Sequence, residues 1–68
     1  MKLIIDVEAE ADGRWLAEVP TLPGVLTYGH TRNDAVARVQ VLALRVLAEK
    51  REHGAAVPEL VDLSFQVA

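Results

Sequence analysis

The chain has 68 residues, about half of them hydrophobic, and a formal net charge of −3 at pH 7. A chain of this length forms a single domain, residues 1–68, and buries only about 60% of its unfolded surface. Because it contains no cysteine, disulfides and thiolate-bound metals are excluded as sources of stability. The acidic balance disfavours direct binding of DNA, which needs a basic patch, and favours a basic protein partner.

The apolar run nearest the N-terminus, Leu3-Ile4-Ile5, ends at Asp6. It is too short for a secretory signal and far too short for a membrane span. Together with the absence of cysteine, this predicts a cytoplasmic protein with no membrane association.

The first predicted elements are two strands that form a hairpin. Apolar and polar residues alternate over residues 3–10 and again over 14–19, as in strands with one buried face. The intervening Ala11-Asp12-Gly13 fits a three-residue loop with its glycine in the left-handed conformation. This loop sets Asp6 directly across from Glu18 and keeps the apolar residues of both strands on one face.

A turn after the second strand organises the rest of the chain. Pro20 and Pro23 cannot donate to a sheet, so each marks a strand end or an edge. Pro23-Gly24 is a strong turn dipeptide, because proline presets φ and glycine tolerates a positive φ. We therefore predict a short third strand over residues 25–28.

A helix is predicted over residues 32–53, and a last strand over residues 60–67. Thr31 is a good N-cap residue, and Asp34 follows three positions later as in a capping box. Gly54 is placed to end the helix. One wide apolar stripe of this helix must lie on the sheet. It consists of Ala35, Val36, Val39, Leu42, Ala43, Val46 and Leu47.

The predicted fold is α+β with the order β-β-β-α-β. It has a small mixed sheet, with the last strand beside and parallel to the first, and one helix packed on one face. This arrangement leaves two groups of apolar residues outside. They are Ile4, Leu16, Leu26 and Tyr28 on the open sheet face, and Val41 and Leu44 on the outer side of the helix. Isolated exposed apolar residues are ordinary, but a core this small favours a homodimer or homotetramer whose interface uses these residues.

The outer face of the predicted strands carries the carboxylates of Asp6, Glu8 and Glu18. Asp62 would join them if the last strand pairs beside the first. Grouped carboxylates can bind Mg²⁺ or Mn²⁺ for phosphodiester cleavage, but the basic residues that would position a phosphate cluster on the helix. We therefore predict no metal, no cofactor, no catalytic residue and no enzyme activity, and expect the acids to dock a basic partner.

Four segments combine an aromatic-containing strand, a Pro-x-Leu-Pro-Gly turn and a Gly-x-Thr step into a helix. They are Asp12–Trp15, Glu18–Val25, Gly29–Thr31 and Asp34–Ala35. In this combination the chain resembles the HicB-like antitoxin family over roughly residues 3–50. It departs from that family at His30, where an acidic residue is common, and at Val25, where cysteine is frequent.

The resemblance implies a reduced RNase H-like or double-stranded-RNA-binding-like fold. It also implies an antitoxin that binds and neutralises a small basic HicA-type toxin, an mRNA-cleaving ribonuclease, with Asp6, Glu8 and Glu18 as the toxin-binding face. Many family members add a C-terminal DNA-binding domain, but this chain ends after the last predicted strand, so no DNA binding is expected. The alternative is a solitary, self-assembling small protein with an unknown ligand and no toxin partner.

Overall fold

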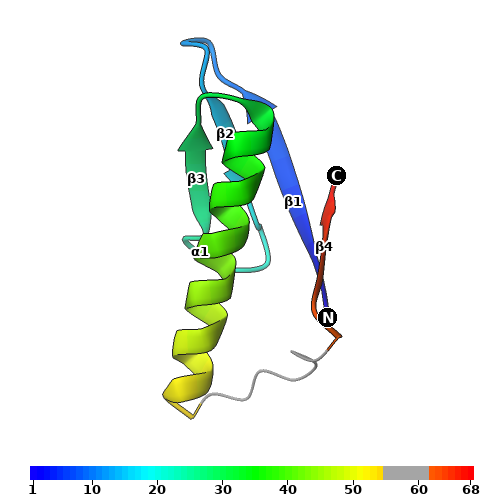
Figure 1. Cartoon of the computed structure of the whole chain (residues 1–68), viewed down its shortest axis with the longest axis vertical. Coiled ribbons are helices and arrows are strands. Elements are labelled where there is room, and N and C mark those ends of the chain that lie inside the picture. The colour runs from blue at the N-terminus through cyan, green and yellow to red at the C-terminus, as the bar shows by residue number, and fades with distance from the viewer. Residues whose placement is uncertain (55–61) are drawn as a thin grey trace.

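The computed structural model describes residues 1–54 and 62–68, which form a four-stranded sheet with a helix on one face (Figure 1). The elements are β1 (Lys2–Ala9), β2 (Trp15–Glu18), β3 (Leu26–Gly29), α1 (Arg32–Glu52) and β4 (Ser64–Val67). The predicted α+β fold and its β-β-β-α-β order are therefore confirmed. The last strand is shorter than predicted: Asp62 and Leu63 precede it, and positions 60 and 61 lie outside the described residues.

The strands lie in the order β3-β2-β1-β4, with β1 antiparallel to β2, β2 antiparallel to β3, and β1 parallel to β4. In Figure 1, α1 lies in front of the sheet, β3 is on the left and β4 is on the right, so the passage from β3 through α1 to β4 is right-handed. The sheet consequently has β3 and β4 as its two edges.

The predicted hairpin register between β1 and β2 is confirmed, with Asp6 across from Glu18. In the loop, the N–H of Gly13 donates to the carbonyl oxygen of Glu10 at 3.1 Å, and the N–H of Glu10 donates to that of Arg14 at 2.8 Å. Gly13 has a φ of +90°. The three-residue loop therefore sets the register that puts the acids of the two strands side by side.

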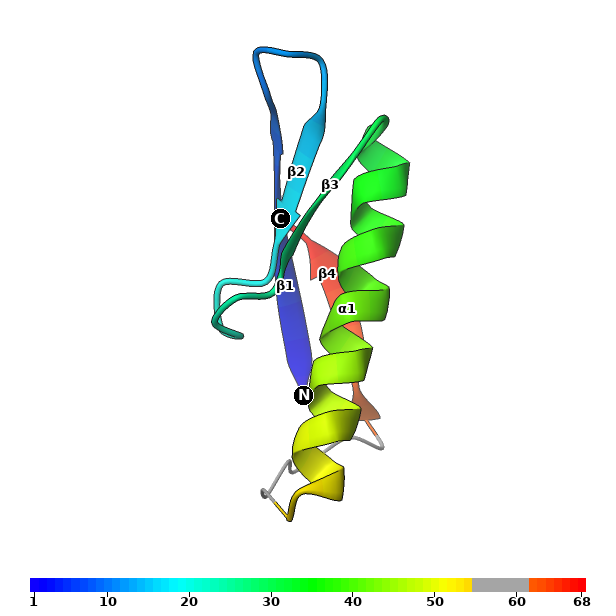
Figure 2. The ribbon, with the colours of Figure 1, turned by 90° about the vertical axis from the view of Figure 1, so that its left-hand side faces the viewer.

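The core lies between α1 and one face of the sheet, and Figure 2 shows the opposite face without a covering element. Four residues of the predicted helix stripe are buried, at a spacing of four. The buried hydrophobic residues of the described chain are Leu3, Ile5, Ala17, Val19, Val25, Ala35, Val39, Ala43 and Leu47. Within residues 1–54 and 62–68, no helix combines the length and the apolar composition needed to cross a membrane.

The predicted turn at Pro20, Pro23 and Gly24 is confirmed. The N–H of Val19 donates to Val25 O at 3.0 Å, which joins the two ends of the loop. Gly24 has a φ of +81°, in the region that favours glycine. Because Val19 and Val25 are both buried, this turn holds the β2 and β3 ends against the core.

β3 runs one residue later than predicted, from Leu26 to Gly29. Gly29 falls just after the predicted strand, but it is the last residue of β3, where it is buried and pairs with Trp15. A Cβ atom at Gly29 would lie 2.5 Å from the backbone nitrogen of Ala35. Glycine is therefore required here because the first turn of α1 lies directly against β3.

Candidate interaction surfaces

The predicted acidic residues meet on the uncovered face of the sheet. Asp6 lies across from Glu18, and Glu8 lies across from Leu16. The acidic face, defined as Asp6, Glu8 and Glu18, lines a depression of about 230 Å³ together with Leu16 and the backbone neighbour Val7. None of the three carboxylates has an ion-pair partner within 4.0 Å in the described part of the chain. Their negative charge is therefore available to an outside partner.

Asp62 does not join the acidic face, although β4 does pair beside β1. The register sets Lys2 across from Ser64, so Asp62 lies beyond the start of β1. The carbonyl oxygen of Asp62 accepts a hydrogen bond from the N-terminal amine of Met1 at 3.2 Å, and Asp6 is five residues further along the chain, on the order of 17 Å away at the rise of a strand. Among residues 1–54 and 62–68, no group of three or more histidine, aspartate or glutamate side chains is arranged to hold a metal ion.

Three of the four apolar residues predicted on the outer sheet face are neighbours. Leu16 lies across from Tyr28, and Leu26 lies across from Glu18 on the adjacent row. Tyr28 and Leu26 are 40% and 41% exposed, and Leu16 is half-buried. Ile4 is set apart, because the pair formed by Asp6 and Glu18 lies between it and Leu16. The compact apolar patch therefore consists of Leu16, Leu26 and Tyr28 without Ile4.

The apolar residues predicted on the outer side of the helix are also exposed. Val41 is 50% and Leu44 is 46% accessible to solvent. Their spacing of three places them on the same side of α1. This side lies away from the stripe of buried residues. Both candidate oligomer surfaces therefore exist as exposed apolar surface on the single chain.

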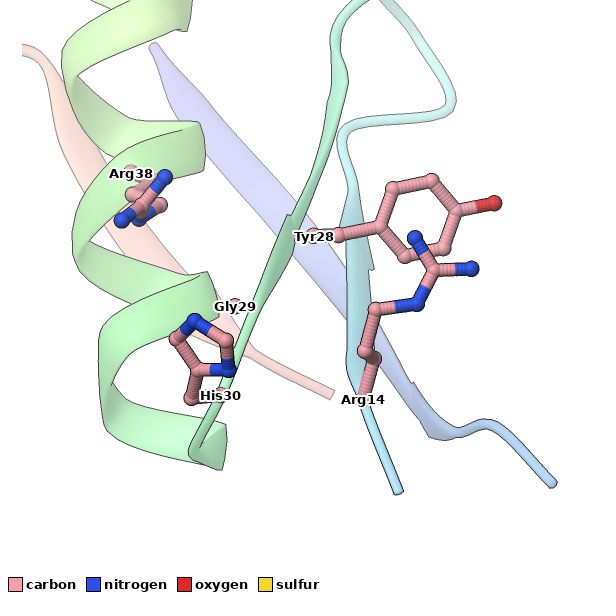
Figure 3. A pocket seen from close by; sticks show the side chains of 5 residues that line it. All are labelled: Arg14, Tyr28, Gly29, His30 and Arg38. Atoms are coloured by element: carbon pink, nitrogen blue, oxygen red, sulfur yellow. The ribbon is translucent and has the colours of Figure 1, made fainter. Parts of the chain in front are cut away.

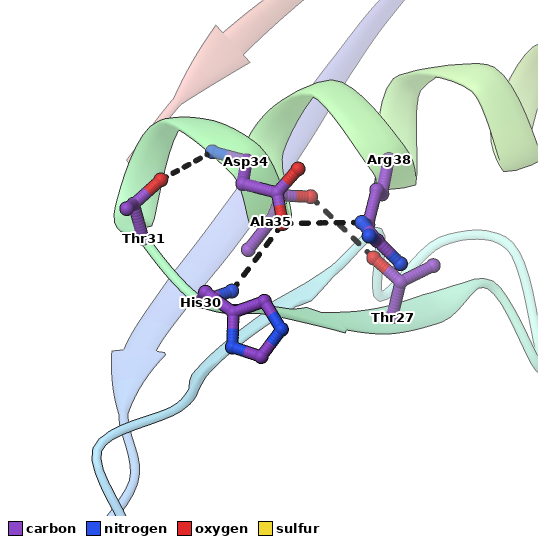
Figure 4. A network of polar contacts seen from close by, with 6 residues as sticks. All are labelled: Thr27, His30, Thr31, Asp34, Ala35 and Arg38. Atoms are coloured by element: carbon purple, nitrogen blue, oxygen red, sulfur yellow. Dashed lines mark hydrogen bonds and ion pairs between the residues drawn. The ribbon is translucent and has the colours of Figure 1, made fainter.

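A network of polar contacts joins β3 to the start of α1 (Figure 4). The N–H of Asp34 donates to Oγ1 of Thr31 at 3.0 Å, which confirms Thr31 as the N-cap. The Asp34 carboxylate accepts the N–H of His30 at 3.3 Å, one residue earlier than in a standard capping box, and pairs with Nε of Arg38 at 3.1 Å. The hydrogen bond from Arg38 is the main cause that lowers the pKa of Asp34.

The open side of β3 carries a groove that the sequence did not reveal. One part is a depression of about 200 Å³ beside the N-terminal end of α1, and the other is a depression of about 560 Å³ further along the helix. They share Tyr28 and Arg38, so we describe them together as the β3–α1 groove. Its lining consists of Arg14, Thr27, Tyr28, Gly29, His30, Arg38, Val41, Leu42 and Arg45.

Arg14 is held in place at the rim of this groove. Its backbone N–H donates to Oδ1 of Asp12 at 3.0 Å, and its side-chain Nε donates to Oδ2 of Asp12 at 2.7 Å. These bonds, the backbone one first, lower the pKa of Asp12. The guanidinium lies 4.2 Å from the centroid of the Tyr28 ring, in cation–π contact (Figure 3). Strand alternation in the sequence could have indicated this contact. Arg14 lies on the same face of the strand as Leu16, two residues later, and Leu16 lies across from Tyr28.

The chain is similar to a UPF0150 protein of Thermoplasma acidophilum. The two are 26% identical over 58 residues, which cover 85% of this chain and 84% of the relative. No protein-family model matches the chain, and no solved structure matches it. The similarity therefore extends over most of both chains.

Proposed function

We propose that this protein is an antitoxin-like protein that binds and neutralises a small basic toxin of the HicA type. The observation that carries the proposal is the acidic face, where Asp6, Glu8 and Glu18 gather on one side of the sheet without cationic partners among the described residues. The kind of partner comes from the motif resemblance around Pro20–Gly24. The name of the similar UPF0150 protein states no activity, so it supports a shared domain and nothing finer.

An acidic face neutralises an RNA-cleaving toxin by occupying the basic residues that would otherwise hold RNA phosphates. The carboxylates steer the encounter, because complementary charges raise the association rate. The neighbouring apolar patch of Leu16, Leu26 and Tyr28 then supplies the surface that becomes fully dehydrated in the contact. The role requires no cofactor and no catalytic residue on this chain, and the site of action is the cytoplasm.

The test is the association rate of the purified protein with a HicA-type toxin. Raising the salt from about 0.05 M to about 0.5 M shortens the reach of charge–charge attraction, so the on-rate should fall. Reversing both Glu8 and Glu18 to lysine should slow association by about tenfold or more and change the off-rate less. The double reversal of Glu49 and Glu52 to lysine, at two exposed positions near the end of α1, is the matched control and should leave the rate nearly unchanged.

Binding that is insensitive to both salt and reversal would place the toxin contact elsewhere. The toxin's RNA cleavage supplies a second readout, since it should be blocked by the wild-type protein and restored by the double reversal. In the absence of toxin, the purified protein with Mg²⁺ or Mn²⁺ should leave RNA intact. Metal-dependent cleavage that is abolished by Asp6→Asn would replace the proposal with an enzymatic function.

The second candidate function is a solitary protein that assembles only with itself, as a homodimer or homotetramer. The exposure of Val41 and Leu44 on α1, in addition to the sheet patch, favours it, since a toxin on the sheet face would leave the helix residues uncovered. Association of like chains with no binding to any basic toxin would support this candidate over the first.

A further inference from the structure

β3 is an open strand edge with unused backbone groups. Val19 and Val25 are joined by a ladder hydrogen bond, and bonded pairs alternate along an antiparallel ladder. The pairs at Thr27 and Gly29 therefore also bond to β2, and Leu26 and Tyr28 direct their N–H and C=O groups away from the sheet. In the described part of the chain no hydrogen bond outside the ladder reaches these groups. Such an edge is a template for an added strand.

The β3–α1 groove beside this edge is basic, although the chain as a whole is acidic. Three of the seven lysine and arginine residues, Arg14, Arg38 and Arg45, line it, and no carboxylate lines it. Arg14 is paired with Asp12 and Arg38 with Asp34. Arg45, in contrast, has no ion pair among the described residues, which leaves its positive charge uncompensated. Figure 3 shows Arg38 and His30 on the helix side of β3, and Tyr28 with Arg14 on the other side. Cationic groups thus flank the edge above and below the plane of the sheet.

We propose that this groove binds an extended acidic segment of a partner protein, which adds a fifth strand next to β3. The backbone of the segment would pair with the free N–H and C=O groups of Leu26 and Tyr28. Successive side chains of a strand point to opposite faces. Glutamate or aspartate on the helix side would meet Arg38 and Arg45 in charge-assisted contacts. Apolar residues on the opposite face would cover the exposed side chains of Leu26 and Tyr28.

A second copy of the chain fits this groove less well. Pairing of β3 with its own copy about a two-fold axis would bring the two α1 helices side by side. Arg38 and Arg45 of one chain would then face the same side chains of the other, and like charges brought together oppose association. A single RNA strand would satisfy the arginines, but its backbone does not offer the regular donors and acceptors that the open edge requires.

The probe for this site is a blocked peptide of about ten residues with alternating glutamate and valine. Its addition should shift the amide resonances of Leu26 and Tyr28 and slow their hydrogen exchange by at least about tenfold, because those N–H groups become hydrogen-bonded. Arg45→Glu should weaken binding by about tenfold, the loss expected for one charge-assisted contact. Arg51→Glu, an equal charge change outside the groove, is the matched control and should bind like wild type.

Four results would overturn the proposal. The first is no amide shift at Leu26 and Tyr28 with millimolar peptide. The second is equal weakening by Arg45→Glu and Arg51→Glu, and the third is tighter binding of a uridine oligonucleotide that produces the same shifts. The fourth is a peptide-free protein that has the mass of two chains and whose Leu26 and Tyr28 amides are already protected from hydrogen exchange. A second copy of the chain would then cover the β3 edge. N-methylation of the edge-facing peptide residues should abolish binding if the added strand forms.

Discussion

The close approach of β3 and α1 at Gly29 predicts a large effect of the smallest substitution, Gly29→Ala. The added Cβ would lie 2.5 Å from the Ala35 nitrogen, 2.8 Å from the Ala35 Cα and 2.9 Å from Oδ2 of Asp34. Two of these three atoms belong to the helix backbone, so no side-chain rotation relieves the overlap. The first turn of α1 must instead move away from the strand.

The size of this movement sets the energetic cost. Restoring an ordinary contact of 3.4 Å from 2.5 Å requires a shift of about 0.9 Å. Overpacking of this kind costs about 1–3 kcal/mol. The shift also weakens the hydrogen bonds from Thr27 Oγ1 to Ala35 O and from the His30 N–H to Asp34, at about 0.5–1.5 kcal/mol each. The higher strand propensity of alanine returns only about 0.5–1 kcal/mol, which leaves a net loss of about 1–5 kcal/mol, with a central value of about 3 kcal/mol.

Urea unfolding at fixed protein concentration measures this loss. With a slope of about 1 kcal/mol per molar urea for so small a chain, the central value predicts that the Gly29→Ala midpoint falls by about 3 M. Gly24→Ala is the control, because it makes the same chemical change at a φ of +81° with no atom within 4 Å of the new Cβ. It should cost about 1–2 kcal/mol through backbone conformation alone. A smaller midpoint shift for Gly29→Ala than for Gly24→Ala would refute the steric argument.

Three further predictions concern the turn, the helix cap and assembly. Gly24→Val should lower stability by about 1–3 kcal/mol, and an unchanged melting curve would show that the turn does not control the fold. Because the pKa of Asp34 is held below its ordinary value of 3.8, its carboxylate contributes stability that is complete above that pH. The contribution should disappear as the pH falls through the lowered pKa, and Asp34→Asn should remove this part of the stability–pH curve. Light scattering at micromolar concentration should give an oligomer, and Leu44→Glu and Leu26→Glu, tested separately, should identify the interface; the mass of one chain would contradict the oligomer.

Local patterns in the sequence determined the elements and their register. Alternation over residues 3–10 and 14–19, joined by a three-residue loop, is enough to pair Asp6 with Glu18, because a slip of one residue would bury charges. Thr31 and Gly54 mark the helix ends through capping chemistry that involves only neighbouring residues. The acidic face followed directly, since it depends on the parity of β1 and β2 alone.

Tertiary structure decided what depends on contacts between distant elements. The alternation of β4 could not show that Asp62 lies beyond the start of β1, because that depends on the register between two strands far apart in the sequence. From its residue type, Gly29 was placed outside the third strand. In the structure, glycine is needed there because the helix backbone at Ala35 leaves no space for a Cβ atom. The β3–α1 groove likewise depends on the fold, because Arg14 from the hairpin and Arg45 from the helix both come to lie along the β3 edge. Side-chain period determines the face on which a residue lies, but only the packing of α1 on the sheet determines which faces meet.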